Sequence, residues 1–152
     1  MSYYIWDIYK GIIKEEFAAD MELIYKARDW SAAESDTLSA LIAKGFWLEN
    51  CTAFQPGCSL FKEEYVNSYD PQTRTLCYAV EWNSHGTNAV TMHNMFEYIL
   101  PAITEKVILY HGCGEDMNHI YTGLTEAFQK EMEYTHRILS EDGLEALLKE
   151  LW

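Results

Sequence analysis

The sequence predicts a single α+β domain spanning residues 1–152, in which helices pack on a mostly antiparallel sheet. A chain of 152 residues has the usual size of one domain, and its hydrophobic fraction of 49% is sufficient for a core. Segments that alternate like strands are interleaved with segments that have helical spacing. No Pro/Gly-rich linker or internal repeat divides the chain.

The first expected element is a strand from Tyr3 to Tyr9, because this segment is aromatic and β-branched, and Gly11 could close it. A helix is expected from Lys14 to Trp30. Apolar residues at intervals of three and four predict its buried face: Phe17, Met21, Ile24 and Tyr25. Acidic residues of the same segment are expected to face water: Glu15, Glu16, Asp20 and Glu22.

A second helix is predicted after the segment Ser31 to Glu34, which has the pattern of a capping box. Leu38, Leu41 and Ile42 would bury this helix, and Gly45 would end it. The spacing then changes, and we expect extended segments at 46–48 and 59–61.

The middle of the chain predicts a β-hairpin, in which strands at 63–66 and 75–82 flank a turn at Tyr69-Asp70-Pro71. In the second strand, larger side chains alternate with smaller ones. We expect the larger ones to pack against helices: Leu76, Tyr78, Val80 and Trp82.

Helical spacing returns from Met92 to Ile103, where Pro101 can kink or end the helix. Strands at 106–111 and 117–122 are expected to flank a glycine-rich turn at 112–116. The segment 124–139 also alternates in part like a strand, and we interpret it as mostly helix. Ser140 is then expected to cap a short terminal helix with a leucine stripe: Leu144, Leu147, Leu148 and Leu151.

The order of these elements resembles a ferredoxin-like βαββαβ domain with a helical C-terminal addition. Between Tyr78 and Gly123, the segments 80–84, 98–101 and 107–110 resemble the YubB-type ferredoxin-like domain of plasmid and phage proteins. The resemblance covers about a third of the chain, and Gly114-Glu115 belongs to it. It implies an origin in a mobile element, and it supplies no catalytic residues.

The formal net charge of −13 is the most unusual property of the sequence. It argues against nucleic acid and anionic membranes as direct partners, because each phosphate contact needs a cation. The carboxylates could form a solubilising coat, or they could gather into a patch that binds a basic protein surface such as a nuclease. The candidate patch residues are these: Glu63, Glu64, Glu115, Asp116, Glu131 and Glu133.

The leading hypothesis is therefore a non-enzymatic binding protein, namely a phage or mobile-element inhibitor of a host nucleic-acid-targeting defence enzyme of the anti-CRISPR or antirestriction type. An alternative is a small-molecule or nucleotide-binding protein, or an enzyme, with a pocket lined by aromatic and polar residues. The candidate pocket residues are these: Trp82, His85, His111 and His119. A third hypothesis, a self-associating structural protein, is supported by the abundant tyrosine and tryptophan, and the sequence does not determine the oligomeric state.

A metal site is the less favoured interpretation of four possible ligands that are close in sequence: His111, Cys113, Asp116 and His119. Structural zinc sites draw on two close pairs of Cys or His, which this segment lacks, so no metal or cofactor is expected. The four cysteines include no CxxC pair, and the segment from Met1 to Asp7 has no secretory pattern. We therefore expect free thiols and a cytoplasmic location in a bacterial host.

Overall fold

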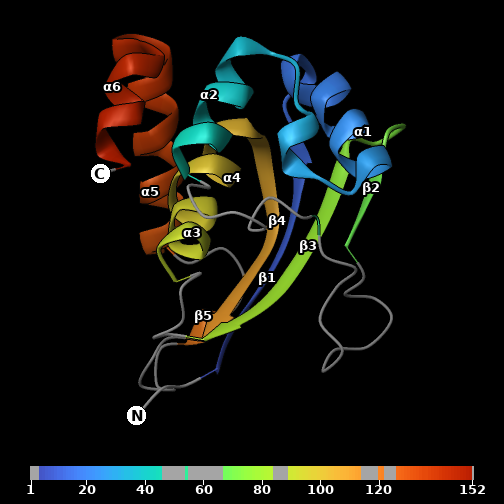
Figure 1. Cartoon of the computed structure of the whole chain (residues 1–152). Helices are drawn as coiled ribbons and strands as arrows, with labels where there is room; N and C mark the ends of the chain where they lie inside the picture. Colours follow the sequence, from blue (N-terminus) through green and yellow to red (C-terminus); the bar gives the residue numbers. More distant parts are fainter. Residues whose placement is uncertain are drawn as a thin grey trace.

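Helices cover one face of a single antiparallel sheet (Figure 1). The computed structural model describes residues 4–45, 54, 67–83, 89–113, 120–121 and 126–151. Within these residues the strand order is β2-β3-β1-β4-β5, and every pair of neighbours is antiparallel. The strands are β1 (Tyr4–Ile13), β2 (Ser68–Asp70), β3 (Thr75–Asn83), β4 (Thr104–Cys113) and β5 (Ile120–Tyr121).

The helices form two groups. The first lies over the sheet and consists of η1 (Glu15–Phe17), α1 (Ala18–Ala27), η2 (Trp30–Ala32), α2 (Asp36–Gly45), α3 (Ala89–Asn94), η4 (Met95–Ile99) and α4 (Leu100–Ile103). The second packs against α4, η4 and α2 and consists of α5 (Glu126–Arg137), η5 (Ile138–Asp142) and α6 (Gly143–Glu150). No helix among the described residues is long and apolar enough to span a membrane.

Strand β1 lies at the centre of the sheet and continues through Gly11, so the prediction that Gly11 closes it was wrong. The register with β4 shifts between Lys10 and Gly11. A Cβ added at Gly11 would lie 2.9 Å from Cγ2 of Thr104 and 3.1 Å from the carbonyl oxygen of Lys106. Glycine is therefore required here by the close approach of β4, and it does not end the strand.

The core lies between the sheet and the helices. The predicted alternation in β3 is confirmed, because Leu76, Tyr78 and Val80 all belong to the buried cluster, while the side chain of Trp82 is outside the description. Tyr78 packs edge-on against Trp30, with ring centroids 5.4 Å apart. Tyr9 is buried on β1, and its hydroxyl lies 2.7 Å from that of Thr104, which donates to the carbonyl of Leu100.

The predicted face of the first helix is confirmed at Phe17, Met21 and Ile24, but Asp20 is buried and does not face water. Its carboxylate accepts hydrogen bonds from the backbone N–H groups of Glu34 and Ser35, at 2.9 and 3.1 Å. The hydroxyl of Ser35 also donates to it. Glu34 and Ser35 follow Asp20 by 14 and 15 positions in the chain, so helical spacing alone does not reveal this contact.

The predicted capping box at Ser31 to Glu34 was also wrong. Ser31 lies inside the short 3₁₀ helix η2, and its N–H donates to the carboxylate of Asp29 at 2.8 Å. Helix α2 begins at Asp36, and the Ser35 hydroxyl accepts the N–H of Leu38 at 3.2 Å. Leu38, Leu41 and Ile42 are buried as expected, and α2 ends at Gly45.

Pro101 does not end the third helical segment. The segment passes through a π-helical turn, η4, and continues to Ile103. Proline has no N–H to bond the carbonyl four residues earlier, which is that of Glu97. The hydroxyl of Thr135 on α5 lies 3.4 Å from this carbonyl oxygen, and this contact joins the second group of helices to the first.

The hairpin of β2 and β3 is confirmed, with its turn at 71–74, so that Tyr69 and Asp70 belong to the strand. Strands β4 and β5 pair as predicted, but Gly112 and Cys113 lie in β4. The helix expected at 124–139 is confirmed as α5. Ser140 does not cap α6, because it lies within η5, although Leu147 and Leu151 are buried. The expected segments 46–48, 59–61 and 63–66 lie outside the described residues.

Candidate functional site

Two surfaces of the described residues have the chemistry of binding sites, and the first is the acidic C-terminal hairpin, which we define as residues 126–150 of α5, η5 and α6. It contains seven Asp and Glu against three Lys and Arg. Glu131 and Glu133, both predicted as patch residues, lie on α5, where Glu133 is exposed and the side chain of Glu131 is outside the description. Glu63, Glu64, Glu115 and Asp116 lie outside the described residues.

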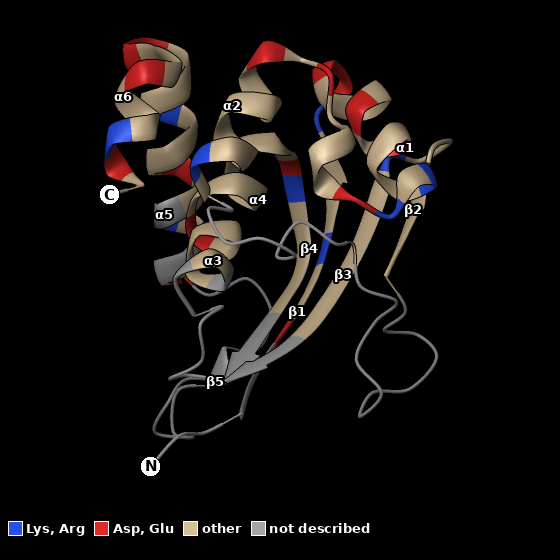
Figure 2. Ribbon diagram, in the orientation of Figure 1, with Lys and Arg blue, Asp and Glu red and all other residues tan. Residues whose placement is uncertain are grey.

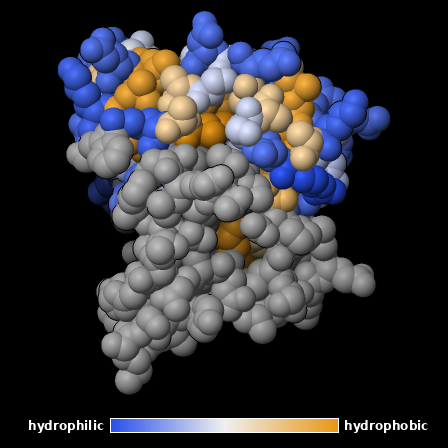
Figure 3. Space-filling model, viewed as in Figure 1, coloured by the Kyte–Doolittle hydropathy of each residue, from blue (hydrophilic) through white to orange (hydrophobic). Residues whose placement is uncertain are grey.

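Acidic residues lie mainly on the helices (Figure 2). The exposed carboxylates of helical residues are these: Glu15, Glu16, Glu22, Asp36, Glu126, Glu133, Glu141, Asp142, Glu145 and Glu150. On strands, Asp70 and Glu105 are the exposed carboxylates among the side chains that the structure describes. In the coloured, upper part of Figure 3, hydrophilic residues lie along the edge, with apolar residues between them.

Ion pairs offset part of the charge of the acidic C-terminal hairpin. Lys130 lies 3.0 Å from Glu126, and Arg137 lies 3.7 Å from Glu141, in both cases at the spacing of one helical turn. Such exposed pairs stabilise a helix only weakly, but they neutralise their own carboxylates. Most of the remaining negative charge lies on α6 and at its start, at Asp142, Glu145 and Glu150.

The second surface is the outer sheet face, which points away from the helices. It consists of the residues that alternate with the core residues of β1, β3 and β4: Ile8, Lys10, Ile12, Thr75, Cys77, Ala79, Lys106 and Leu109. Ile12 and Leu109 are only partly buried and are outside the core cluster. Lys10 and Lys106 are exposed on this face. Glu105, next to Lys106 on β4, is also exposed and pairs with Arg74 at 3.2 Å.

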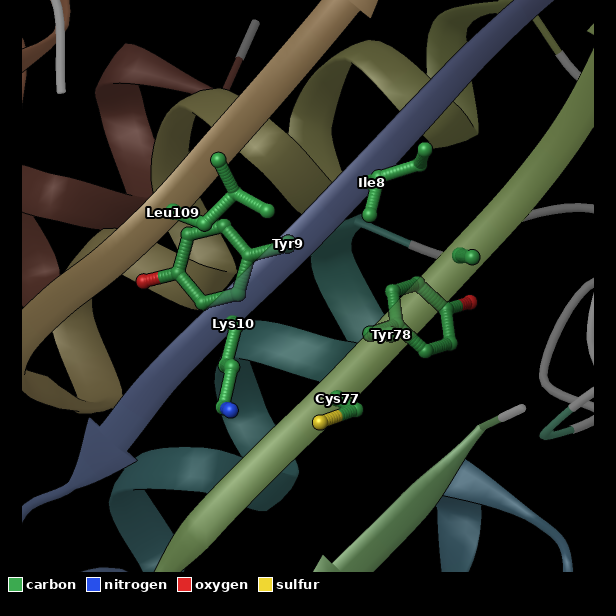
Figure 4. A pocket seen from close by; sticks show the side chains of 7 residues that line it. Ile8, Tyr9, Lys10, Cys77, Tyr78 and Leu109 are labelled. Carbon is green, nitrogen blue, oxygen red and sulfur yellow. The ribbon is translucent and has the colours of Figure 1, made fainter. Parts of the chain in front are cut away.

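A hollow of about 280 Å³ lies on the outer sheet face. It is lined by Ile8, Tyr9, Lys10, Cys77, Tyr78, Ala79 and Leu109. The register explains this set, because Lys10 is paired with Cys77 on one side and with Leu109 on the other, while Ile8 is paired with Ala79. Figure 4 shows Lys10 and Cys77 on neighbouring strands, with the helices behind the sheet.

None of the predicted pocket residues is among the residues that line this hollow. Trp82 is paired with Ile5 and His111 with Ile8, so the backbones of both residues flank β1. Their side chains are outside the description, and His85 and His119 lie outside the described residues. Of the suggested metal ligands, His111 and Cys113 lie on β4 and Asp116 is outside the described residues. The described residues contain no group of three potential ligands.

Sequence reasoning missed the residues that line the hollow. The alternation in β3 had separated the small side chains Cys77 and Ala79 from the large ones, which was the available signal. That pattern does not reveal which residue of a distant strand lies beside them. Only the register brings Lys10 next to Cys77, 67 positions away in the chain.

The two surfaces differ in both charge and shape. The acidic C-terminal hairpin has more carboxylates than cations, whereas the outer sheet face has a hollow lined in part by a lysine. No protein-family model, curated protein or solved structure matches this chain. These two surfaces are therefore the features from which its function is inferred.

Proposed function

We propose that this protein is a non-enzymatic binding protein whose acidic C-terminal hairpin engages a basic protein surface such as that of a nuclease. The observation that carries the proposal is that the exposed carboxylates lie mainly on the helices, with Asp142, Glu145 and Glu150 gathered on α6 and at its start. A surface with one sign of charge speeds association with a partner of the opposite sign and selects against partners of the same sign.

A more specific form of the proposal is an inhibitor of a host nucleic-acid-targeting defence enzyme, encoded by a phage or mobile element and acting in the bacterial cytoplasm. Carboxylates on a helical surface present negative charge at intervals, as a nucleic-acid backbone does. The net charge of −13 supports this form, because a cationic groove that binds phosphates would also attract a strongly acidic protein.

We also propose that the fold is ferredoxin-like. The strand order β2-β3-β1-β4 supports this, with helices between β1 and β2 and between β3 and β4. In this interpretation, the acidic C-terminal hairpin is an addition to the shared arrangement.

The test compares two triple variants with the same change in charge. The first is Glu133→Gln with Asp142→Asn and Glu145→Gln on the acidic C-terminal hairpin. The control is Glu15→Gln with Glu16→Gln and Glu22→Gln, at η1 and α1, on the opposite end of the helical layer (Figure 1). Binding to a Cas9-type effector and to a panel of restriction endonucleases is measured by biolayer interferometry at rising salt.

We expect at least one of these enzymes to bind at low salt, with an association rate that falls steeply as salt increases. The hairpin triple variant should weaken binding about tenfold more than the control triple variant. Equal losses in the two variants would assign binding to net charge and not to the hairpin. Absence of binding to every enzyme at low salt would overturn the proposal.

A further inference from the structure

The hollow on the outer sheet face exists because small and large side chains are juxtaposed there. Cys77 and Ala79 are short and occupy successive outward positions of β3. Beside them, Ile8 and Leu109 are long and come from β1 and β4. A sheet face with this arrangement is recessed over the short side chains, since neighbouring strands lie only about 4.8 Å apart and the long side chains form the walls.

The lining of the hollow combines apolar side chains, those of Ile8, Ala79 and Leu109, with the polar groups of Lys10 and Cys77. Tyr9 and Tyr78 also line it, and both belong to the core cluster. Ile8 and Ala79 are buried, Leu109 and Cys77 are half-buried, and Lys10 is exposed. Cys77 is a free thiol, which packs as a small apolar group. The stem of Lys10 can lie along the apolar wall while its ammonium stays in water. Among the described residues, no carboxylate forms an ion pair with Lys10.

We propose that this hollow is a binding site for a small anionic amphiphile, that is, a carboxylate with a short apolar body. The apolar body would occupy the recess between Ile8, Ala79 and Leu109, and the carboxylate would reach the ammonium of Lys10. A volume of about 280 Å³ lies just below the usual range for ligand pockets, about 300–1,000 Å³, and therefore favours a small ligand. This site is separate from the acidic C-terminal hairpin and does not depend on its function.

Charge decides between ligands that share the same apolar body. The whole protein carries a formal charge of −13 and would attract a cationic amphiphile in general. At the hollow, however, the nearest described charge is that of Lys10, and at physiological salt more distant charges are screened over about 8 Å. An anionic head is therefore selected by the site itself and not by the overall field.

The experiment uses three probes with the same eight-carbon body: octanoate, octanol and octylammonium. The full-length protein is treated with iodoacetamide, and the alkylation rate of Cys77 is measured by peptide mass spectrometry with and without each probe. The alkylation rates of the other three cysteines in the same sample report any effect of a probe on the reagent itself. Octanoate at low millimolar concentration should slow alkylation of Cys77 several-fold, octanol less so and octylammonium least.

Two variants locate the interaction. Lys10→Met keeps a long apolar stem and removes the charge, and it should weaken octanoate protection about tenfold while leaving octanol protection unchanged. Its matched control is Lys26→Met, which removes an exposed lysine from α1 and should change neither. Cys77→Leu fills the recess, and its octanoate binding, followed by amide NMR shifts at Ala79 and Leu109, should be lost.

Three results would overturn the proposal. One is an unchanged alkylation rate of Cys77 in octanoate, and another is protection by octylammonium that equals protection by octanoate. The third is an equal loss of protection in Lys10→Met and Lys26→Met. None of these results bears on binding of a basic protein by the acidic C-terminal hairpin, so the two proposals fail independently.

Discussion

The two faces of strands β1 and β3 differ in burial and in chemistry. On the helix-facing side, Tyr9 and Tyr78 are each 1% exposed and pack against the aromatic rings of the core. One position along each strand, Lys10 is exposed and Cys77 is half-buried. Successive side chains of one strand therefore have different roles: those on one face stabilise the core, and those on the other form the outer surface.

The same comparison explains why stability and binding can be altered separately here. Residues that face the helices are fixed by many contacts, and a change there leaves a cavity or a clash. On the outer sheet face, Lys10 is exposed and Cys77 is half-buried, so both have access to water. Ile8 and Ala79 of the same face are buried. Substitutions on the two faces should therefore give distinct results, and the following predictions test this in order of decreasing effect.

The largest effect is expected for Tyr78→Ala compared with its neighbour Cys77→Ala. Removing a fully buried aromatic ring should lower the free energy of unfolding by about 3–5 kcal/mol, because the lost burial is combined with a cavity. Cys77→Ala should cost below about 1 kcal/mol. Urea unfolding followed by tryptophan fluorescence measures both. Similar losses in the two variants would show that the outer sheet face is as tightly packed as the core.

A smaller effect is expected for Gly11→Ala, which tests the close approach of β4 to β1. The new Cβ would lie 3.1 Å from the backbone oxygen of Lys106 and 3.0 Å from Cε1 of Tyr9, so we expect a loss of about 1–3 kcal/mol. Gly45→Ala is the matched control, because its closest contact is the end of the Ile99 side chain, at 2.7 Å. That side chain can rotate, and alanine favours the helix by about 1 kcal/mol, so the control should cost less.

The smallest effect is a pH dependence at His136, which joins the second group of helices to the first. Burial lowers the pKa of His136 below its usual value of 6.5, and the positive charge of Lys14 acts in the same direction. Hydrogen bonding to the backbone at Pro101 and Thr104 and the charge of Glu133 act against this shift. The unfolded chain therefore binds a proton more readily than the folded protein does.

This contribution to stability is fully present above about pH 6.5 and decreases as the pH falls from there toward the folded pKa. Free energies of unfolding of the parent protein and of His136→Gln, measured between pH 5 and 8, should diverge below this point, with the parent protein more sensitive to acid. Lys14→Met should reduce the pH dependence of the parent. Parallel curves for parent and His136→Gln would rule out the proton linkage.

The local periodicity of the sequence predicted most of the secondary structure. Spacing alone predicted the buried helical face at Phe17, Met21 and Ile24 and the inner face of β3. Each of these patterns depends only on residues that are close together in the chain. Errors occurred where a distant residue intervened. Asp20 has the spacing of an exposed helical residue, yet it is buried because it accepts hydrogen bonds from Glu34 and Ser35.

The candidate site was predicted less well than the fold. Sequence reasoning identified the acidic charge and placed Glu131 and Glu133 on a helix, but it had no means to show that exposed carboxylates lie mainly on the helical side. It also missed the hollow, because Lys10, Cys77 and Leu109 come from three strands. The spatial proximity of these residues depends on pairing register, which no local pattern encodes.

The amino-acid sequence alone determined the α+β class, the net charge and the alternation that assigns residues to opposite faces of a strand. Tertiary structure decided the strand order, the register shift at Lys10 and Gly11, and the burial of Asp20. The physical reason is the range of the interactions. Periodicity reflects burial of residues that are close in the chain, whereas sites form where the fold brings distant residues together.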